Sequence, residues 1–196
     1  MLQVRQIVNR VFTSNTFVLS DDDFKTCWLV DVGDVKKVLD ILPGGGVVKG
    51  VLLTHTHFDH IYGINELYRR FPEMEVCTSE YGSLALYSEK KNFSFYHEEP
   101  IVFEGKNVRV LQDGEEIELS PWSRLKVMAT PGHCPSCLCY YNERMIFTGD
   151  SYIPEVAVVS KLPRGNKALA TESKEKIFSL AKGKIIYPGH GMSVNG

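Results

Sequence analysis

The chain has 196 residues with 22 basic and 24 acidic side chains, which give a formal net charge of −2 at pH 7. Hydrophobic residues make up 43% of the sequence, enough to bury the core of one globular domain, so we expect a single domain over residues 1–196. Because there is no global basic field, binding to nucleic acid or to an anionic membrane is not expected.

The expected location follows from two observations. The first ten residues, MLQVRQIVNR, lack the apolar core of a signal peptide, and no apolar run approaches the roughly 20 residues that cross a bilayer. The five cysteines are an odd number, and three of them lie within residues 134–139, which is not the spacing of a secreted disulfide framework. We therefore expect a cytoplasmic protein whose thiols stay reduced.

Strands and helices are expected to alternate in the first half of the chain. Runs rich in Val, Ile, Leu and aromatic residues predict strands at 2–12, 15–20 and 26–33, with a turn at 21–23. Apolar spacing then predicts a helix over 34–42, a buried strand over 47–54 and a helix over 61–71. A strand at 75–80, a helix over 81–90 and a strand around 107–114 follow.

The second half is expected to be mostly strand. Short strands are predicted at 116–119, 124–129, 138–141 and 145–147, with a hairpin turn at 142–143. A helix over 171–181 leads to a last strand at 184–187. Strands interspersed with helices indicate an α/β domain of packed sheets covered by helices.

The most informative segment directly follows the buried strand at 47–54. It contains four potential metal ligands within six positions: His55, His57, Asp59 and His60. In an extended segment His55 and His57 point to the same side, because side-chain direction alternates. Asp59 and His60 come where the chain turns into a helix, so they can face a second point a few ångströms away. Imidazole and carboxylate are suitable ligands for zinc, iron or manganese, so one loop could provide ligands to two adjacent metal ions.

Three further candidate ligands end predicted strands in the same way. They are His133 in ATPGHCPS, Asp150 in IFTGDS and His190 in IIYPGHG. A glycine precedes each of them, and glycine permits the close backbone approach of a tight turn into a metal site. Five of the six histidines thus lie in these motifs, and only His97 has no assigned role.

The order of these residues resembles the metallo-β-lactamase superfamily, whose signature is H-x-H-x-D-H followed by a His, an Asp and a final His at later strand ends. The phrases TPGH, FTGD and YPGHG are most similar to glyoxalase II-like hydrolases. The resemblance implies an αββα four-layer sandwich with the metals at one edge of the two sheets. It also implies two groups of ligands with Asp150 bridging them: His55, His57 and His133 at one metal, and Asp59, His60 and His190 at the other.

The expected activity is metal-dependent hydrolysis of a small ester, thioester or lactone, with phosphoesters and β-lactams less favoured. Two divalent ions about 3.5 Å apart, zinc first and iron or manganese as alternatives, would bring the pKa of a bound water toward neutrality and give a metal-bound hydroxide. The metals would also stabilise the negative charge of the transition state. Asp59 is expected both to bind metal and to orient the nucleophile.

Differences from particular members of the superfamily limit which activities are expected. Glyoxalase II enzymes carry a C-terminal helical domain, whereas this sequence stops six residues after His190, so glyoxalase II activity proper is not expected. Asp150 stands where subclass B1 and B2 β-lactamases have a cysteine. His57 stands where oxygen-reducing flavodiiron proteins carry a carboxylate.

Weaker signals lie around the motifs. Cys134, Cys137 and Cys139 follow His133, where the family more often has Thr-Pro-Gly-Ser; they are small buried side chains, an extra ligand or a redox-sensitive switch. The aromatic stretch 90–96 either walls the substrate pocket or is covered by the domain itself or by a homodimer partner. Tyr62 is a pocket candidate with packing as its alternative. In the loop after Asp150, a solvated surface is favoured over contact with an anionic substrate for the following residues: Lys161, Arg164 and Asn166.

Two rival functions remain. The first is a mononuclear-iron oxidoreductase similar to persulfide dioxygenases, which would bind one iron through His55, His133 and Asp150. The second is a non-catalytic metal-binding module, which the complete set of ligands disfavours. An RNA-processing nuclease is less favoured still, because the chain has no basic appendage.

Overall fold

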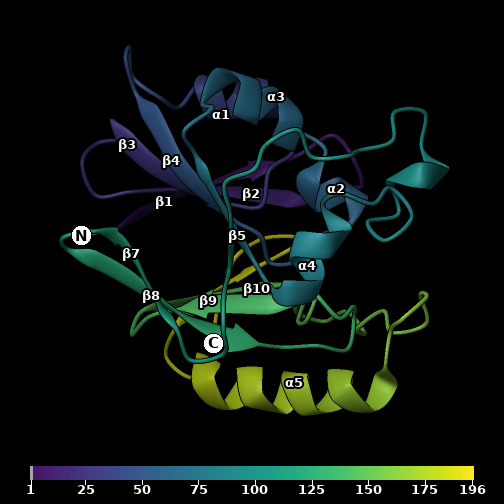
Figure 1. Cartoon of the computed structure of the whole chain (residues 1–196). Coiled ribbons are helices and arrows are strands. Elements are labelled where there is room, and N and C mark those ends of the chain that lie inside the picture. The colour runs from purple at the N-terminus through teal and green to yellow at the C-terminus, as the bar shows by residue number, and fades with distance from the viewer. Residues whose placement is uncertain (1) are drawn as a thin grey trace.

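The computed structural model describes residues 2–196 as two six-stranded sheets packed face to face, with helices outside both (Figure 1). The first sheet has the order β1-β2-β3-β4-β5-β6 and contains the following strands: β1 (Gln3–Val8), β2 (Asn15–Ser20), β3 (Thr26–Val30), β4 (Val47–Leu52), β5 (Glu75–Thr78) and β6 (Val108–Val110). Its first three strands are antiparallel and the others pair in parallel. The parallel half brings the carboxyl ends of β3 and β4 to the same edge.

The second sheet has the order β12-β11-β10-β9-β8-β7. Its strands are β7 (Glu116–Ser120), β8 (Ser123–Ala129), β9 (Leu138–Tyr141), β10 (Met145–Gly149), β11 (Ile185–Pro188) and β12 (Val194–Asn195). Along β8, Leu125 and Val127 are buried while Arg124 and Lys126 are exposed, the alternation of a sheet with one face in the core. Only β10 and β11 pair in parallel, so β10 and β11 end side by side.

Helices cover both outer faces. Figure 1 shows α1 (Val35–Leu39) and α3 (Ile64–Arg70) on the first sheet and α5 (Lys167–Ala181) along the second. The other helical segments are α2 (Phe58–Ile61), α4 (Glu80–Ala85) and a short 3₁₀ turn, η1 (Ser94–Tyr96). One apolar core lies between the first sheet and its helices, a second lies between the sheets, and a third lies beneath α5. The predicted αββα sandwich is therefore confirmed.

Several local predictions need correction. The strand expected at 2–12 ends at Val8, and the helix expected over 81–90 ends at Ala85. The helix expected over 61–71 starts at Phe58 and is interrupted at Gly63, where a Cβ would lie 2.0 Å from the carbonyl oxygen of Gly33, so the chain must pass closely there. The last helix begins at Lys167 instead of residue 171, because the Asn166 side chain caps it by accepting a hydrogen bond from the Leu169 N–H. The short strand β12 was not predicted. Within residues 2–196, no helix is long and apolar enough to span a bilayer.

Candidate metal centre

The loop after β4 carries the first four candidate ligands into the space between the two sheets. β4 ends at Leu52 and α2 begins at Phe58, so His55 and His57 lie in the connection while Asp59 and His60 lie in the first turn of α2. His55 and His60 are fully buried. The turn into α2 is what separates the second pair of side chains from the first, as the sequence predicted.

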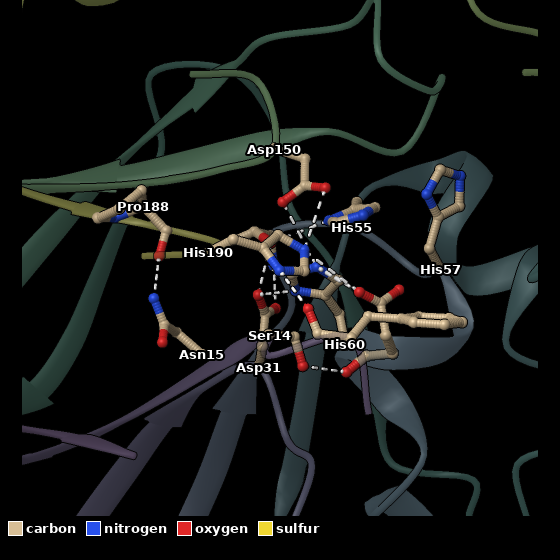
Figure 2. Close-up of polar contacts among 12 residues, drawn as sticks. Ser14, Asn15, Asp31, His55, His57, His60, Asp150, Pro188 and His190 are labelled. Atoms are coloured by element: carbon tan, nitrogen blue, oxygen red, sulfur yellow. Dashed lines mark hydrogen bonds and ion pairs between the residues drawn. The ribbon is translucent and has the colours of Figure 1, made fainter. Parts of the chain in front are cut away.

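The other three candidates reach the same place from the second sheet. His133 lies in the turn after β8, Asp150 directly follows β10, and His190 comes two residues after β11. Figure 2 shows Asp150 and His190 facing His55 and His60 across the gap between the sheets. The structure thus brings together all seven residues that the sequence singled out.

The first group consists of His55, His57 and His133, whose potential ligand atoms lie within 4.8 Å of one another. The Nε2 atom of His133 is 2.9 Å from Nδ1 of His57. The ring centroid of His55 lies 4.6 Å from that of His57 and 5.0 Å from that of His133. Three imidazoles converging in this way match the donor set of a zinc or iron site.

The second group consists of Asp59, His60 and His190. Oδ2 of Asp59 lies 3.4 Å from Nε2 of His60 and 3.3 Å from Nε2 of His190. Asp150 stands between the two groups: its Oδ1 is 3.4 Å from Nε2 of His60, and its Oδ2 is 3.7 Å from Nε2 of His133. A carboxylate in this position can bridge two cations.

Whether these residues fit metal ions can be judged from their hydrogen bonds. Four buried side-chain nitrogen or oxygen atoms in residues 2–196 lack a hydrogen-bond partner, and three of them are Nε2 of His55, Nε2 of His60 and Oδ1 of Asp150. Leaving a buried polar atom unsatisfied costs about 1–3 kcal/mol. All three atoms face the shared space, so cations there would remove the penalty, and the residues fit a metal centre.

Contacts with backbone carbonyl groups fix which nitrogen faces that space in two of the imidazoles, those of His133 and His190. Nδ1 of His133 lies 2.7 Å from the carbonyl oxygen of Val159, and Nδ1 of His190 lies 3.0 Å from that of Phe12. A carbonyl only accepts, so both Nδ1 atoms carry a hydrogen, and the Nε2 atom has a free lone pair whenever the imidazole is neutral.

Sequence reasoning missed Asp31, which orients His60. Asp31 directly follows β3, adopts a left-handed backbone with φ of 57°, and is buried. It accepts hydrogen bonds from the N–H and hydroxyl of Thr54 (2.7 Å each) and lies 2.8 Å from Nδ1 of His60. Although Asp31 also lies near His55, both of its oxygens are already engaged in these hydrogen bonds. We therefore interpret it as a residue that positions His60. One signal in the sequence could have found it. Asp31 is a carboxylate at the end of a predicted buried strand, and the next predicted strand leads into His55.

The charges of the side chains at the centre offset one another. Burial, reinforced by neighbouring imidazolium charge, lowers the pKa of His55 well below its ordinary value. Burial also disfavours charge on His60, but the surrounding carboxylates outweigh it and raise its pKa. Burial also lowers the pKa of His190, but hydrogen bonds with Asp150 and Asp59 outweigh it and raise that pKa to about 9. Although burial raises the pKa of the Asp59 and Asp150 carboxyl groups, the nearby charge of His60 outweighs it and lowers both. Cations would thus displace protons from His60 and His190.

A cleft of about 1200 Å³ is lined by none of the seven candidate ligands, but Phe12, which does line it, has its carbonyl oxygen 3.0 Å from Nδ1 of His190. Its aromatic lining residues are Phe12, Phe58, Tyr62, Tyr96 and His97. Phe58, another lining residue, immediately precedes Asp59 in α2. His97, which had no assigned role, stacks on Phe58 with ring centroids 3.8 Å apart. Tyr62 donates a hydrogen bond to Asp34 (2.6 Å), so it both lines the cleft and stabilises the fold.

The remaining weaker candidates differ in their distance from the centre and the cleft. In the aromatic stretch, Phe93 packs against the ring of His57 at 4.9 Å, while Tyr96 is 75% exposed and lines the cleft. Lys161 and Arg164 are exposed, and Asn166 caps α5. All five cysteines are buried and free.

Comparisons with known proteins agree with this geometry. The profile of the metallo-beta-lactamase superfamily matches residues 10–190. The hydroxyacylglutathione hydrolase of Enterobacter sp. (strain 638) is 30% identical over 180 residues, which are 91% of this chain and 62% of that protein. This chain therefore spans less than two thirds of that relative's length.

Two solved structures are similar over nearly the whole chain. The BLEG-1 B3 metallo-beta-lactamase has a TM-score of 0.87 at 26% identity, covering 98% of this chain and 93% of its own. TTHA1623, solved in a di-iron-bound form, has a TM-score of 0.81 at 21% identity, covering 98% and 94%. The chain belongs to the metallo-β-lactamase superfamily.

Proposed function

We propose that this protein is a binuclear metallohydrolase that cleaves a small ester, thioester or lactone. The observation that carries the proposal is the pair of converging donor groups with Asp150 between them, each with buried atoms that lack hydrogen-bond partners. The name of the curated relative, hydroxyacylglutathione hydrolase, supports a thioester among the substrates. The free thiols fit a reducing cytoplasmic location.

Two groups of residues would hold the metals: His55, His57 and His133 at one ion, and Asp59, His60 and His190 at the other, with Asp150 shared. Zinc is the metal we propose, and iron is the alternative that the di-iron-bound neighbour supports. Bound divalent ions supply Lewis acidity, which polarises a carbonyl and makes water more acidic. Asp59, whose side chain is 14% exposed, would orient the attacking water and accept its hydrogen bond.

The cleft supports a small-molecule substrate. Its aromatic residues can pack against the acyl or leaving group and exclude water from the reacting carbonyl. Phe58 lies nearest in sequence to Asp59, and His97 holds its ring in place by stacking. Because Phe12 also lines the cleft and its carbonyl oxygen lies 3.0 Å from Nδ1 of His190, the part of the substrate that does not react would lie along Phe58 with the scissile bond toward the metal centre.

Elemental analysis of the purified protein tests the metal centre. About two ions per chain are expected, and His57→Ala and Asp59→Ala should each bind fewer. His97→Ala is the matched control, because its imidazole belongs to neither donor group, and it should keep the full metal content. One iron per chain that survives in both His57→Ala and Asp59→Ala would favour the dioxygenase instead.

Substrate class is tested separately with a panel of acyl thioesters, aryl esters and lactones, each assayed with the metal-loaded protein. Hydrolysis that falls by at least a hundredfold in Asp59→Ala reconstituted with excess metal would support the proposed role of Asp59. A fully loaded protein that hydrolyses none of these substrates, or an Asp59→Ala variant with undiminished rates, would overturn the proposal.

A further inference from the structure

The segment after His133 contains two thiols in contact beside the candidate metal centre. Sγ of Cys134 lies 3.3 Å from Sγ of Cys137, and both side chains are buried. The two intervening residues form a turn. The first and last Cα atoms of a four-residue turn lie within about 7 Å, and a disulfide needs roughly 4.4–6.8 Å, so this backbone can accept the bond.

The geometry points to a reversible disulfide between Cys134 and Cys137 that weakens metal binding by His55, His57 and His133. This modification site goes beyond the proposed hydrolysis. Its chemistry requires an oxidant, for which a small peroxide is suitable. Two thiols and one peroxide give one disulfide and two molecules of water: two S–H bonds and the O–O bond break, the S–S bond forms, and both thiol protons end on the reduced oxygens. A dithiol reverses the reaction by exchange.

Access limits the oxidant to a small molecule. A narrow cleft of about 10 Å³ is lined by Cys134 together with His57 and Phe93. This volume is about that of one water-sized probe, so hydrogen peroxide is a better match than a bulky disulfide. Cys139 has different surroundings, because its thiol lies 3.3 Å from the hydroxyl of Thr130. It is therefore a natural control within the same segment.

The thiol pair is connected to the ligand loop in two ways. Cys134 is bonded directly to His133, and its thiol lies 3.1 Å from the hydroxyl of Ser136. That hydroxyl accepts a hydrogen bond from the backbone N–H of Thr56, the residue between His55 and His57. Moving Cys134 therefore changes both the turn that carries His133 and the support of the ligand loop.

Of the two cysteines, Cys134 is the one expected to move. The carbonyl of Cys137 accepts a hydrogen bond from Thr130 (3.0 Å), and the next residue, Leu138, begins β9 and donates to the carbonyl of Thr54 (2.7 Å). Closing 3.3 Å to the disulfide length of about 2 Å requires a shift of roughly 1 Å. Loss of a supporting contact around a ligand typically weakens metal binding by about 10–100-fold.

Mass spectrometry of the metal-loaded protein tests the bond directly. After brief treatment with a few equivalents of hydrogen peroxide, the protein is denatured and alkylated with N-ethylmaleimide. Five labelled thiols are expected before oxidation and three after it, with a loss of two hydrogens confined to the peptide spanning 134–137 and reversed by a phosphine reductant. Five labels after oxidation, a bond that includes Cys139, or oxidation of Cys134 to a sulfinic acid without a cross-link would overturn the inference.

Competition with a chromophoric chelator tests the effect on metal. In the oxidised protein the affinity of one ion should fall at least tenfold and recover on reduction. Cys137→Ser should keep both ions after peroxide, whereas the matched variant Cys139→Ser should respond as the unaltered protein does. Unchanged affinity in the cross-linked protein, or equal loss of metal from Cys137→Ser, would refute the link to the metal centre. If Cys137→Ser does not fold, the label count in the unaltered protein still decides whether the disulfide forms.

Discussion

Replacing Asp31 by asparagine should weaken the second group of ligands selectively. Oδ1 of Asp31 accepts the N–H of Thr54, and Oδ2 lies 2.7 Å from the hydroxyl of Thr54 and 2.8 Å from Nδ1 of His60. A carboxylate only accepts, so it keeps the hydrogen of a neutral His60 on Nδ1 and leaves the Nε2 lone pair facing Asp59 and Asp150.

The asparagine amide cannot reproduce this arrangement. Because the backbone N–H of Thr54 can only donate, the amide oxygen must occupy the Oδ1 position, and the amide NH₂ then faces Nδ1 of His60. An N–H donor there favours the tautomer of His60 with its hydrogen on Nε2. In that tautomer Nε2 has no free lone pair and cannot bind a cation. We expect a 10–100-fold loss of affinity for the second ion, equivalent to about 1.4–2.7 kcal/mol.

The assay is zinc titration of metal-free protein against a chromophoric chelator. In Asp31→Asn the affinity of one ion should fall while that of the ion held by His55, His57 and His133 stays within about threefold, because supporting contacts act on their own ligand. Asp34→Asn is the matched control, with the same chemical change three residues away and outside both donor groups. Two ions bound with unaltered affinity in Asp31→Asn, or equal loss of both, would refute this reasoning.

Three further predictions concern stability. Despite burial, hydrogen bonds from Tyr62 and others lower the pKa of Asp34 from 3.8 to about 2, so this carboxylate stabilises the fold above pH 3.8, and the loss in unfolding free energy in Asp34→Asn should shrink as pH falls toward 2. Asn166→Ala removes the cap of α5 and should cost about 0.5–2 kcal/mol in urea unfolding. Gly149 has φ of 49°, and a Cβ there would lie 2.5 Å from the Thr54 hydroxyl, so Gly149→Ala should cost about 1–3 kcal/mol and reduce bound zinc.

Each of these has a clear contrary result. A pH-independent difference between the native protein and Asp34→Asn would exclude the ionised carboxylate as the stabilising group. For the helix cap, Thr171→Ala on the exposed side of α5 is the comparison, and equal effects would exclude a specific role for the Asn166 side chain. Full zinc content and stability in Gly149→Ala would show that the turn before Asp150 tolerates a side chain.

The agreement between sequence and structure is strongest where the signal is local. The alternation of side chains along an extended segment placed His55 and His57 in one group, and the turn into α2 placed Asp59 and His60 in another. The helix expected over 61–71 was correct for Ile64–Arg70 but wrong in its start and its continuity, for the opposite reason. Its apolar spacing is helical throughout, but the interruption at Gly63 arises from close contact with Gly33, which the spacing does not encode.

The sequence by itself determined the superfamily, the αββα sandwich and the seven residues that meet at its edge, because these depend on residue identity and order along the chain. The tertiary structure decided what supports them. His190 is held by the carbonyl of Phe12, 178 positions away, and His133 by that of Val159. Every residue has a backbone carbonyl, so no sequence pattern marks the ones that are used. The contact between Cys134 and Cys137 and the stacking of His97 on Phe58 likewise depend on how the turn and the loop fold against the sheets.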